Sequence, residues 1–202
     1  MMTIIFVRHG ESESNVARVQ TSEIDKYHLT ARGRTQVERL TRELVSLQPN
    51  TIYCSPVLRA VETAEIISGG LGIPVQVSSS LKERDWGKAN GMKVQDFEAE
   101  VNLLLAADQF GIETILNITR RVNKFMEEVN PGLSVAVTHA DVIRGALVYP
   151  LGLDEDEFSS YGIVPENATM TMLKNREGRF EIVSIGSPRA TESMLKAVEG
   201  QS

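Results

Sequence analysis

Short apolar runs alternate along the chain with longer segments in which apolar residues recur every three or four positions. The short runs are rich in β-branched residues, which is typical of buried strands, and they lie at 3–7, 51–54, 74–77 and 133–137. The periodic segments predict amphipathic helices at about 31–47, 57–68, 113–129 and 141–151. Two later runs with a turn between them predict a hairpin at 169–174 and 179–185. Strands that alternate with helices in this way predict an α/β sandwich on a mostly parallel sheet.

The middle of the chain has a less regular pattern. The stretch from Leu81 to Phe110 contains Trp86 and an apolar patch at 103–105, without a long period of either kind. Short helices packed as a small cap are the structure that this stretch favours. We therefore expect one domain over residues 1–202, with a cap insertion at about 86–111.

Three other segments carry weaker expectations. Residues 11–27 are polar and show no clear period. Gly69 and Gly70 are expected to end the helix at 57–68. The acidic residues from Asp154 to Glu157 predict a solvated loop, and the tail after Pro188 is expected to be frayed or to form a short helix.

Composition and charge narrow the class of protein. The net charge of −6 disfavours a nucleic-acid binder and a protein that binds anionic membranes. No apolar run approaches the ~18 residues that a membrane-spanning helix needs, and the N-terminus does not have the pattern of a signal peptide. The single cysteine, Cys54, cannot form an internal disulfide, so a cytoplasmic protein is expected. The oligomeric state is left open, with a homodimer among the options.

Two histidines occur directly after predicted strands. Arg8 and His9 follow the run at 3–7, and His139 follows the run at 133–137. In an open α/β sheet, ligands bind at the carboxyl ends of the strands. Arg59, early in the helix after the second strand, and Glu83, a short loop after the third, can reach the same edge. The candidate site thus contains two imidazoles, two guanidiniums and one carboxyl group.

This set of side chains fits phosphoryl transfer. Two arginine forks and a histidine can hold the oxygens of a phosphoryl group, and a neutral histidine is a competent nucleophile toward phosphorus. A carboxyl group such as Glu83 can protonate the leaving oxygen and then take a proton from water. The alternative is a metal site made of His9, His139 and Glu83. It is disfavoured because two arginines would repel the ion and because the spacing matches no local ligand motif.

Four short blocks resemble the signatures of the histidine phosphatase superfamily, the phosphoglycerate mutase-like enzymes. The first block is Arg8-His9-Gly10-Glu11-Ser12, with Asn15 after it. The other blocks run from Ser55 to Ala60, from Leu81 to Arg84, and from Val137 to His139. Each block is weak alone, but four in the family's order make a chance match improbable. The resemblance covers roughly residues 3 to 147.

The resemblance implies a fold and a role for each matched residue. It implies a three-layer α/β/α sandwich whose mostly parallel sheet has one antiparallel strand. His9 would be the phosphorylated nucleophile and Glu83 the proton donor, without a metal or other cofactor. Further residues would bind the phosphoryl group, and they are Arg8, Asn15, Arg59, His139 and Ala140. Ala140 departs from the family, which usually has glycine there, and this puts rate and substrate in question more than activity.

The expected activity is hydrolysis of a small phosphorylated metabolite. A phosphoglycerate mutase is the alternative, and a non-catalytic protein that binds phosphorylated ligands is a weaker one because no catalytic group is missing. The mutases of the family resemble this chain in the catalytic blocks but carry a longer insertion before the last block. The short cap here has just one cation on either side of Gly91, Lys88 and Lys93, and no arginine. A short cap with little positive charge should admit water, which favours a phosphatase.

Overall fold

The computed structural model describes residues 2–100, 109–153 and 162–199, with the side chains of 98–100 left aside. Its centre is a six-stranded sheet in the order β3-β2-β4-β1-β5-β6. The strands are β1 (Met2–Arg8), β2 (Thr51–Cys54), β3 (Val75–Val77), β4 (Gly132–Thr138), β5 (Met170–Arg176) and β6 (Arg179–Ser187). β1 to β4 are mutually parallel, and β5 pairs antiparallel with both β1 and β6. β5 is thus the strand that runs against the other five, which confirms the expected fold.

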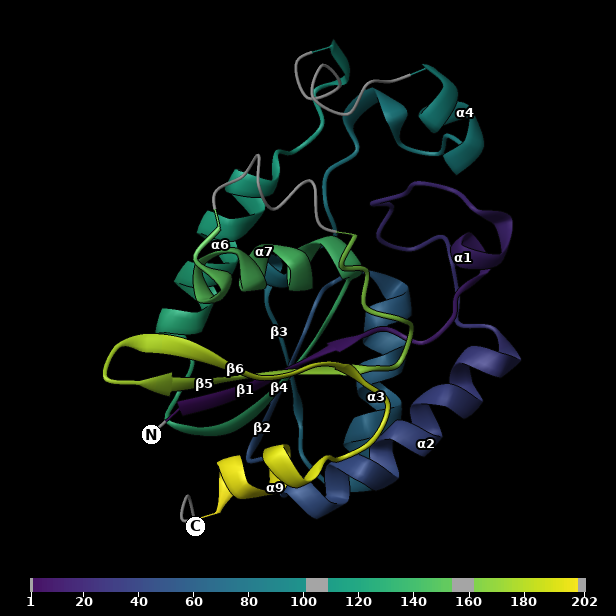
Figure 1. Cartoon of the computed structure of the whole chain (residues 1–202). Coiled ribbons are helices and arrows are strands. Elements are labelled where there is room, and N and C mark those ends of the chain that lie inside the picture. Colours follow the sequence, from purple (N-terminus) through teal and green to yellow (C-terminus); the bar gives the residue numbers. More distant parts are fainter. Residues whose placement is uncertain (1, 101–108, 154–161, 200–202) are drawn as a thin grey trace.

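Helices cover both faces of the sheet and make three layers (Figure 1). One face packs against α2 (Ala31–Leu47), α3 (Leu58–Leu71) and α9 (Glu192–Val198), and the other against α6 (Ile115–Glu128) and α7 (Ala140–Leu151). The alternation within β1 explains the two cores, because Ile5 faces the first layer and Ile4 the second. The apolar stripes that predicted α2 and α6 are the buried faces of these helices.

The helix after β2 is longer than the sequence predicted. α3 continues through Gly69 and Gly70 and ends at Leu71, with Gly72 in the left-handed region at φ +70°. A Cβ at Gly70 would lie 2.3 Å from the side chain of Thr41 on α2. Gly70 therefore serves close packing between two helices, and Gly72 takes the terminating role that was assigned to the glycine pair.

The C-terminal part holds the predicted hairpin and a helix. Glu177 and Gly178 both have positive φ, the geometry of a tight hairpin turn, and they join β5 to β6. The tail forms α9, whose Met194 is fully buried in the core beside α2 and α3. Of the two options for the tail, the short helix is the one observed. The acidic segment 154–157 and the leucine patch 103–105 lie outside the described residues.

A small third core lies above the carboxyl edge of the sheet. It is formed by Trp86, Ala89, Phe97 and Ile112, from η2 (Gly87–Ala89), α4 (Val94–Glu100) and their flanks. Backbone hydrogen bonds tie this region to the polar stretch 18–22, and Gly91 N–H donates to the Gln20 oxygen over 2.7 Å. The stretch 11–27 contains one short helix, α1 (Glu13–Ala17), which its lack of periodicity did not predict. No helix of the described ranges is long and apolar enough to cross a bilayer.

Candidate active site

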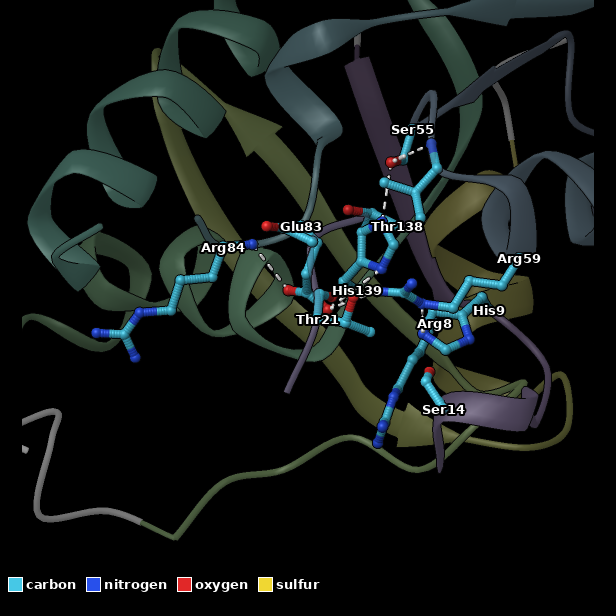
Figure 2. A network of polar contacts seen from close by, with 12 residues as sticks. Arg8, His9, Ser14, Thr21, Ser55, Arg59, Glu83, Arg84, Thr138 and His139 are labelled. Atoms are coloured by element: carbon cyan, nitrogen blue, oxygen red, sulfur yellow. Dashed lines mark hydrogen bonds and ion pairs between the residues drawn. The ribbon is translucent and has the colours of Figure 1, made fainter. Parts of the chain in front are cut away.

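Two strand ends meet at the centre of the site. β1 and β4 are parallel neighbours in which Arg8 lies opposite Thr138, so the next residues, His9 and His139, leave the sheet side by side. Both rings are buried, and they meet edge to face with their centroids 5.2 Å apart. Figure 2 shows the two rings with Arg8 and Arg59 beside them. The structure thus brings together the two histidines that the strand pattern placed at this edge.

His9 is held in one tautomer, with an unprotonated nitrogen that faces Arg59. Its Nδ1 lies 2.7 Å from the carbonyl oxygen of Gly10, which can only accept, so we assign the proton to Nδ1. Nε2 then carries the lone pair, and Nε–H of Arg59 donates to it over 3.1 Å. Burial, with Arg59, His139 and Arg8 nearby, lowers the pKa of His9 well below 6.5. His9 is therefore a neutral imidazole with an available lone pair, the nucleophilic form.

Arg59 connects three parts of the site. It lies in the first turn of α3, and its side chain is only 3% exposed. Besides His9, its Nη2 contacts the Thr21 carbonyl oxygen at 3.1 Å and Glu83 Oε2 at 3.3 Å. The short loop before α3 thus places a guanidinium between the nucleophile and the candidate proton donor.

Glu83 and His139 form a second pair, supported by Ser55. His139 Nδ1 lies 3.3 Å from Glu83 Oε2, and its Nε2 lies 2.8 Å from Ser55 Oγ. Ser55 Oγ already accepts from the Val57 N–H over 3.2 Å, so its own proton is free to donate to His139 Nε2. This arrangement leaves the proton of His139 on Nδ1, directed toward Glu83.

The charges of this pair follow from burial and from their neighbours. Burial alone would raise the pKa of Glu83, but His139 and Arg59 outweigh burial and lower it to about 2. Burial lowers the pKa of His139 to about 4, although Glu83 acts in the opposite direction. At neutral pH the pair is therefore a carboxylate beside a neutral imidazole. A phosphate dianion bound next to them would raise both pKa values, because its negative charge disfavours the Glu83 carboxylate and favours a protonated His139.

Three buried donors of the site have no hydrogen-bond partner among the described residues. They are Arg8 Nε, Arg59 Nη1 and His139 Nδ1, the last with only the ion-pair contact to Glu83. A buried donor without a partner costs about 1–3 kcal/mol, so three in one place indicate a site that a ligand completes. All three are N–H groups on cationic or protonatable side chains. Their chemistry fits an anion with several oxygens.

Hydrogen bonds from distant segments fix the loop that carries His9. Asn167 Nδ2 lies 3.0 Å from the His9 oxygen and 3.2 Å from Asn15 Oδ1, and Gly10 N–H donates to Thr63 Oγ1 over 3.1 Å. Asn15 Oδ1 also accepts from Ser12 N–H over 3.0 Å, so only its amide nitrogen is left for a ligand. The backbone of the loop is thereby set before any substrate arrives.

A cavity of about 440 Å³ opens over these groups. Every residue predicted for the site lines it except His139, whose Nδ1 contacts the lining residue Glu83, and the list is Arg8, His9, Asn15, Arg59, Glu83 and Ala140. Sequence reasoning missed several other residues of the wall: Thr21, Asp141 and Arg144. Arg84 is ion-paired with Asp141, and both Arg84 and Trp86 line the cavity.

His9, Glu83 and His139 also lie close enough together to be considered as metal ligands. One ligand atom from each lies within 4.8 Å of the others. Arg59, however, already donates to the lone pair of His9 and pairs with Glu83. A metal would have to displace this guanidinium and then tolerate its charge. The residues present do not fit a metal, so metal-free chemistry remains our expectation.

Lowering the pH should weaken the fold through the two buried histidines. Between pH 6.5 and about 4 the unfolded chain binds protons on His9 and His139 that the folded chain excludes. The free energy of unfolding should therefore fall with pH by up to about 1.4 kcal/mol per pH unit for each histidine. Glu83 acts in a lower window, where its contribution is lost as the pH falls from 4.5 through about 2. Urea unfolding at pH 7 and pH 4.5 measures the difference.

Two histidine variants serve as matched tests of this prediction. His139→Asn should make the pH dependence shallower in that window, whereas His28→Gln should leave the slope there unchanged. His28 is exposed and its pKa is raised above 6.5 by Glu62, so its contribution to stability is fully present throughout that window and is lost only as the pH rises above 6.5. Equal slopes in wild type and His139→Asn would show that His139 is not buried neutral.

The fold and the site together define a class of α/β proteins in which two buried histidines leave neighbouring parallel strands beside two arginines. The model of the histidine phosphatase superfamily, branch 1, matches residues 4–188 of this chain. The chain therefore belongs to this superfamily, as the four sequence blocks predicted.

The named relatives include both a phosphoglycerate mutase and phosphatases. The chain is 34% identical to the 2,3-bisphosphoglycerate-dependent phosphoglycerate mutase of Thermoplasma acidophilum, over 97% of this chain and 98% of that protein. It is 29% identical to phosphoserine phosphatase 1 of Hydrogenobacter thermophilus, over 92% of each. A mycobacterial glucosyl-3-phosphoglycerate phosphatase has the same fold, with a TM-score of 0.81 at 23% identity over 93% of this chain and 100% of that one.

Proposed function

We propose that this chain hydrolyses small phosphomonoesters through a phosphohistidine intermediate on His9. The observation that carries the proposal is the set of three buried, unpartnered donors beside His9 Nε2, on Arg8, Arg59 and His139. They can bind the oxygens of a phosphoryl group while the lone pair of Nε2 faces its phosphorus.

The first step forms the covalent intermediate. His9 Nε2 attacks phosphorus, and the ester bond to the leaving oxygen breaks. Glu83 gives its proton to that oxygen, so an alcohol leaves. The carboxylate takes up this proton when the substrate dianion binds, because the added negative charge raises the pKa of Glu83. Arg59 turns from the lone pair of His9 to the phosphoryl oxygens in the same event.

The second step returns the enzyme to its starting state. Water attacks the phosphoryl group of phospho-His9, and the Glu83 carboxylate accepts a proton from that water. The N–P bond breaks, inorganic phosphate leaves and Nε2 regains its lone pair, and Glu83 releases its proton to solvent once the dianion has departed. Asn15, through its amide nitrogen, and Ala140, at the start of α7, complete the phosphate-binding set. No metal is needed because Arg8 and Arg59 supply the positive charge.

The cap is part of this proposal. The chain acts as a single domain with a cap insertion at about 86–111, and the described residues of that cap lie beside the substrate's far end. Its described part packs as a separate small core and contributes Trp86 and Phe97 to the cavity wall. Substrate choice would then depend on this wall and on α7.

Phosphoglycerate mutase activity is the second candidate, and one observation favours it. The Thermoplasma protein named a mutase aligns with this chain over almost the whole length of both. That protein therefore lacks a long insertion relative to this chain, and the short cap does not separate the two activities as the sequence argument expected. What still favours hydrolysis is charge: Arg84 and Arg144, the outer arginines of the cavity, are both paired with Asp141. A second phosphate would have to compete with that carboxylate.

One assay separates the two functions. The enzyme is given 3-phosphoglycerate with a catalytic amount of 2,3-bisphosphoglycerate, and 2-phosphoglycerate and free phosphate are followed together. A panel of other phosphomonoesters is run in parallel. We expect phosphate release from at least one ester to outpace isomerisation by about tenfold or more, since the water-accessible site hydrolyses phospho-His9. Isomerisation faster than every hydrolysis would instead identify a mutase.

A further inference from the structure

The outer wall of the catalytic cavity contains opposite charges that are not fully paired. Arg84 and Asp141 both line the cavity, and Arg84 Nη1 lies 3.6 Å from Asp141 Oδ2, which is an ion pair but too long for a hydrogen bond. Their side chains are 14% and 13% exposed. Each group therefore keeps hydrogen-bonding capacity while it faces the space above the phosphate-binding residues.

Arg84 is held in place by groups other than Asp141. Its Nε–H donates to the Glu113 carbonyl oxygen over 2.7 Å, and its guanidinium lies 5.1 Å from the centre of the Trp86 ring. Figure 2 shows the side chain directed away from His9 and His139, at the outer side of the site. A substrate bound at His9 would therefore reach Arg84 with the end that does not react.

Asp141 has a structural role, but that role does not use all of its oxygens. It lies in the first turn of α7, where a negative charge is favourable, and its Oδ1 contacts Arg144 at 3.1 Å. Helix stabilisation would be served equally by a carboxylate that faces solvent. Here Asp141 instead lines the cavity, two residues from His139, and its Oδ2 is paired with the fixed guanidinium of Arg84.

We infer that the cavity selects phosphomonoesters whose far end carries an ammonium group next to a carboxylate, the pattern of an α-amino acid. The substrate carboxylate would bind Arg84, and its ammonium would donate to Asp141. The ligand thereby bridges the 3.6 Å gap and satisfies both groups. The inference rests on the proposed function, and it specifies the substrate class of the same site.

The two charges together explain why simpler far ends fit less well. A carboxylate without an ammonium gains Arg84 but lies beside the negative Asp141, in a partly desolvated place where repulsion is strong. An ammonium without a carboxylate gains Asp141 but leaves Arg84 as it was. Only the zwitterionic end makes a favourable contact with each group.

The test uses two substrates of nearly equal shape. O-phosphoserine and 3-phosphoglycerate share the phosphate and the carboxylate, and they differ in an ammonium or a hydroxyl on the carbon between them. We expect kcat/KM of the wild type to favour O-phosphoserine by about tenfold to a hundredfold, the range of one charge-assisted hydrogen bond. Asp141→Asn should bring the ratio close to one. Asp25→Asn, an exposed aspartate outside the cavity, should leave the ratio unchanged.

A second variant guards against a loss of folding in Asp141→Asn. Arg84→Gln should lower kcat/KM for both carboxylate substrates and leave phosphoethanolamine, which has only the ammonium, within about twofold. Asp141→Asn, in contrast, should lower kcat/KM for phosphoethanolamine, because it removes the partner of the ammonium. The inference is wrong if the wild type hydrolyses p-nitrophenyl phosphate but shows no preference for O-phosphoserine, or if Asp141→Asn slows both matched substrates equally. Phosphate release from no ester at all would overturn the proposed function, and the inference with it.

Discussion

Replacement of His9 by alanine should lower kcat for phosphomonoester hydrolysis by about 10⁵-fold or more, the size seen when a catalytic nucleophile is removed. The side chain is buried at the end of β1, with Nδ1 fixed by Gly10 and Nε2 facing Arg59. No other nucleophile of the described cavity wall is activated in the same way. Steady-state phosphate release with wild type and variant, at equal folded concentration, measures the loss.

The matched control is another histidine of the same chain. His28 is exposed and pairs with Glu62 on the outer side of α3, away from the cavity. His28→Ala should therefore keep kcat within about twofold, which is the range of a surface change. If His9→Ala retained a rate near that of the wild type, the nucleophile would have to be another residue or water.

Removal of the Arg59 side chain should have the second largest effect. Arg59→Ala should lower kcat/KM by about 10³-fold or more, because it removes a buried donor to the phosphoryl oxygens and leaves Glu83 with one fewer cation. Vanadate, which can take a five-coordinate geometry on His9, should inhibit the wild type competitively. The variant should bind vanadate at least about a hundredfold more weakly, and inhibition constants measured against the same substrate provide the comparison.

Two further variants separate charge from geometry at this position. Arg59→Lys keeps a cation but not the planar fork, so it should recover only a small part of the lost rate. Arg120→Ala removes an exposed arginine from α6, on the opposite layer, and should change neither rate nor inhibition. Equal vanadate inhibition of wild type and Arg59→Ala would remove Arg59 from the phosphoryl-binding set.

The strand ends were predictable from sequence because they depend on local pattern. An uninterrupted apolar run that stops at Arg8-His9, and another that stops at Thr138-His139, can only be central strands with polar ends at one edge. Parallel pairing of β1 with β4 then brings both histidines together without any further information. Arg59 and Glu83 were placed near the same edge by their positions shortly after the second and third strands, and the family blocks then gave each a role.

Contacts between distant segments were not predictable in this way. Asn167 holds the oxygen of His9 from 158 residues away, and nothing in its own neighbourhood indicates that role. Thr21 contributes only a carbonyl oxygen to Arg59, which any residue could supply. Gly70 looked like the end of a helix because its close packing against Thr41 appears only in three dimensions. Sequence patterns report local structure, whereas these features depend on which helices and loops become neighbours.

The choice of substrate also depends on contacts between distant segments rather than on local sequence pattern. The length of the cap can be counted in the sequence, but a similar chain named a mutase has nearly the same length. The pairing of Arg84 and Arg144 with Asp141 becomes visible only when α7 and the loop after η1 (Ser79–Leu81) are placed beside one another. Charge in the outer wall, rather than the length of the cap, is therefore the feature on which we base the substrate assignment.

The most direct test of the account is to trap the phosphoryl group on His9. Glu83→Gln is incubated in EDTA-treated buffer with ³²P-labelled p-nitrophenyl phosphate, whose leaving group needs no proton, so the first step proceeds while the second lacks its base. We predict stoichiometric label that is acid-labile and alkali-stable, located on His9 and absent from the His9→Ala/Glu83→Gln double variant. Acid-stable label on another residue, or turnover by Glu83→Gln without any label, would contradict a phosphohistidine mechanism.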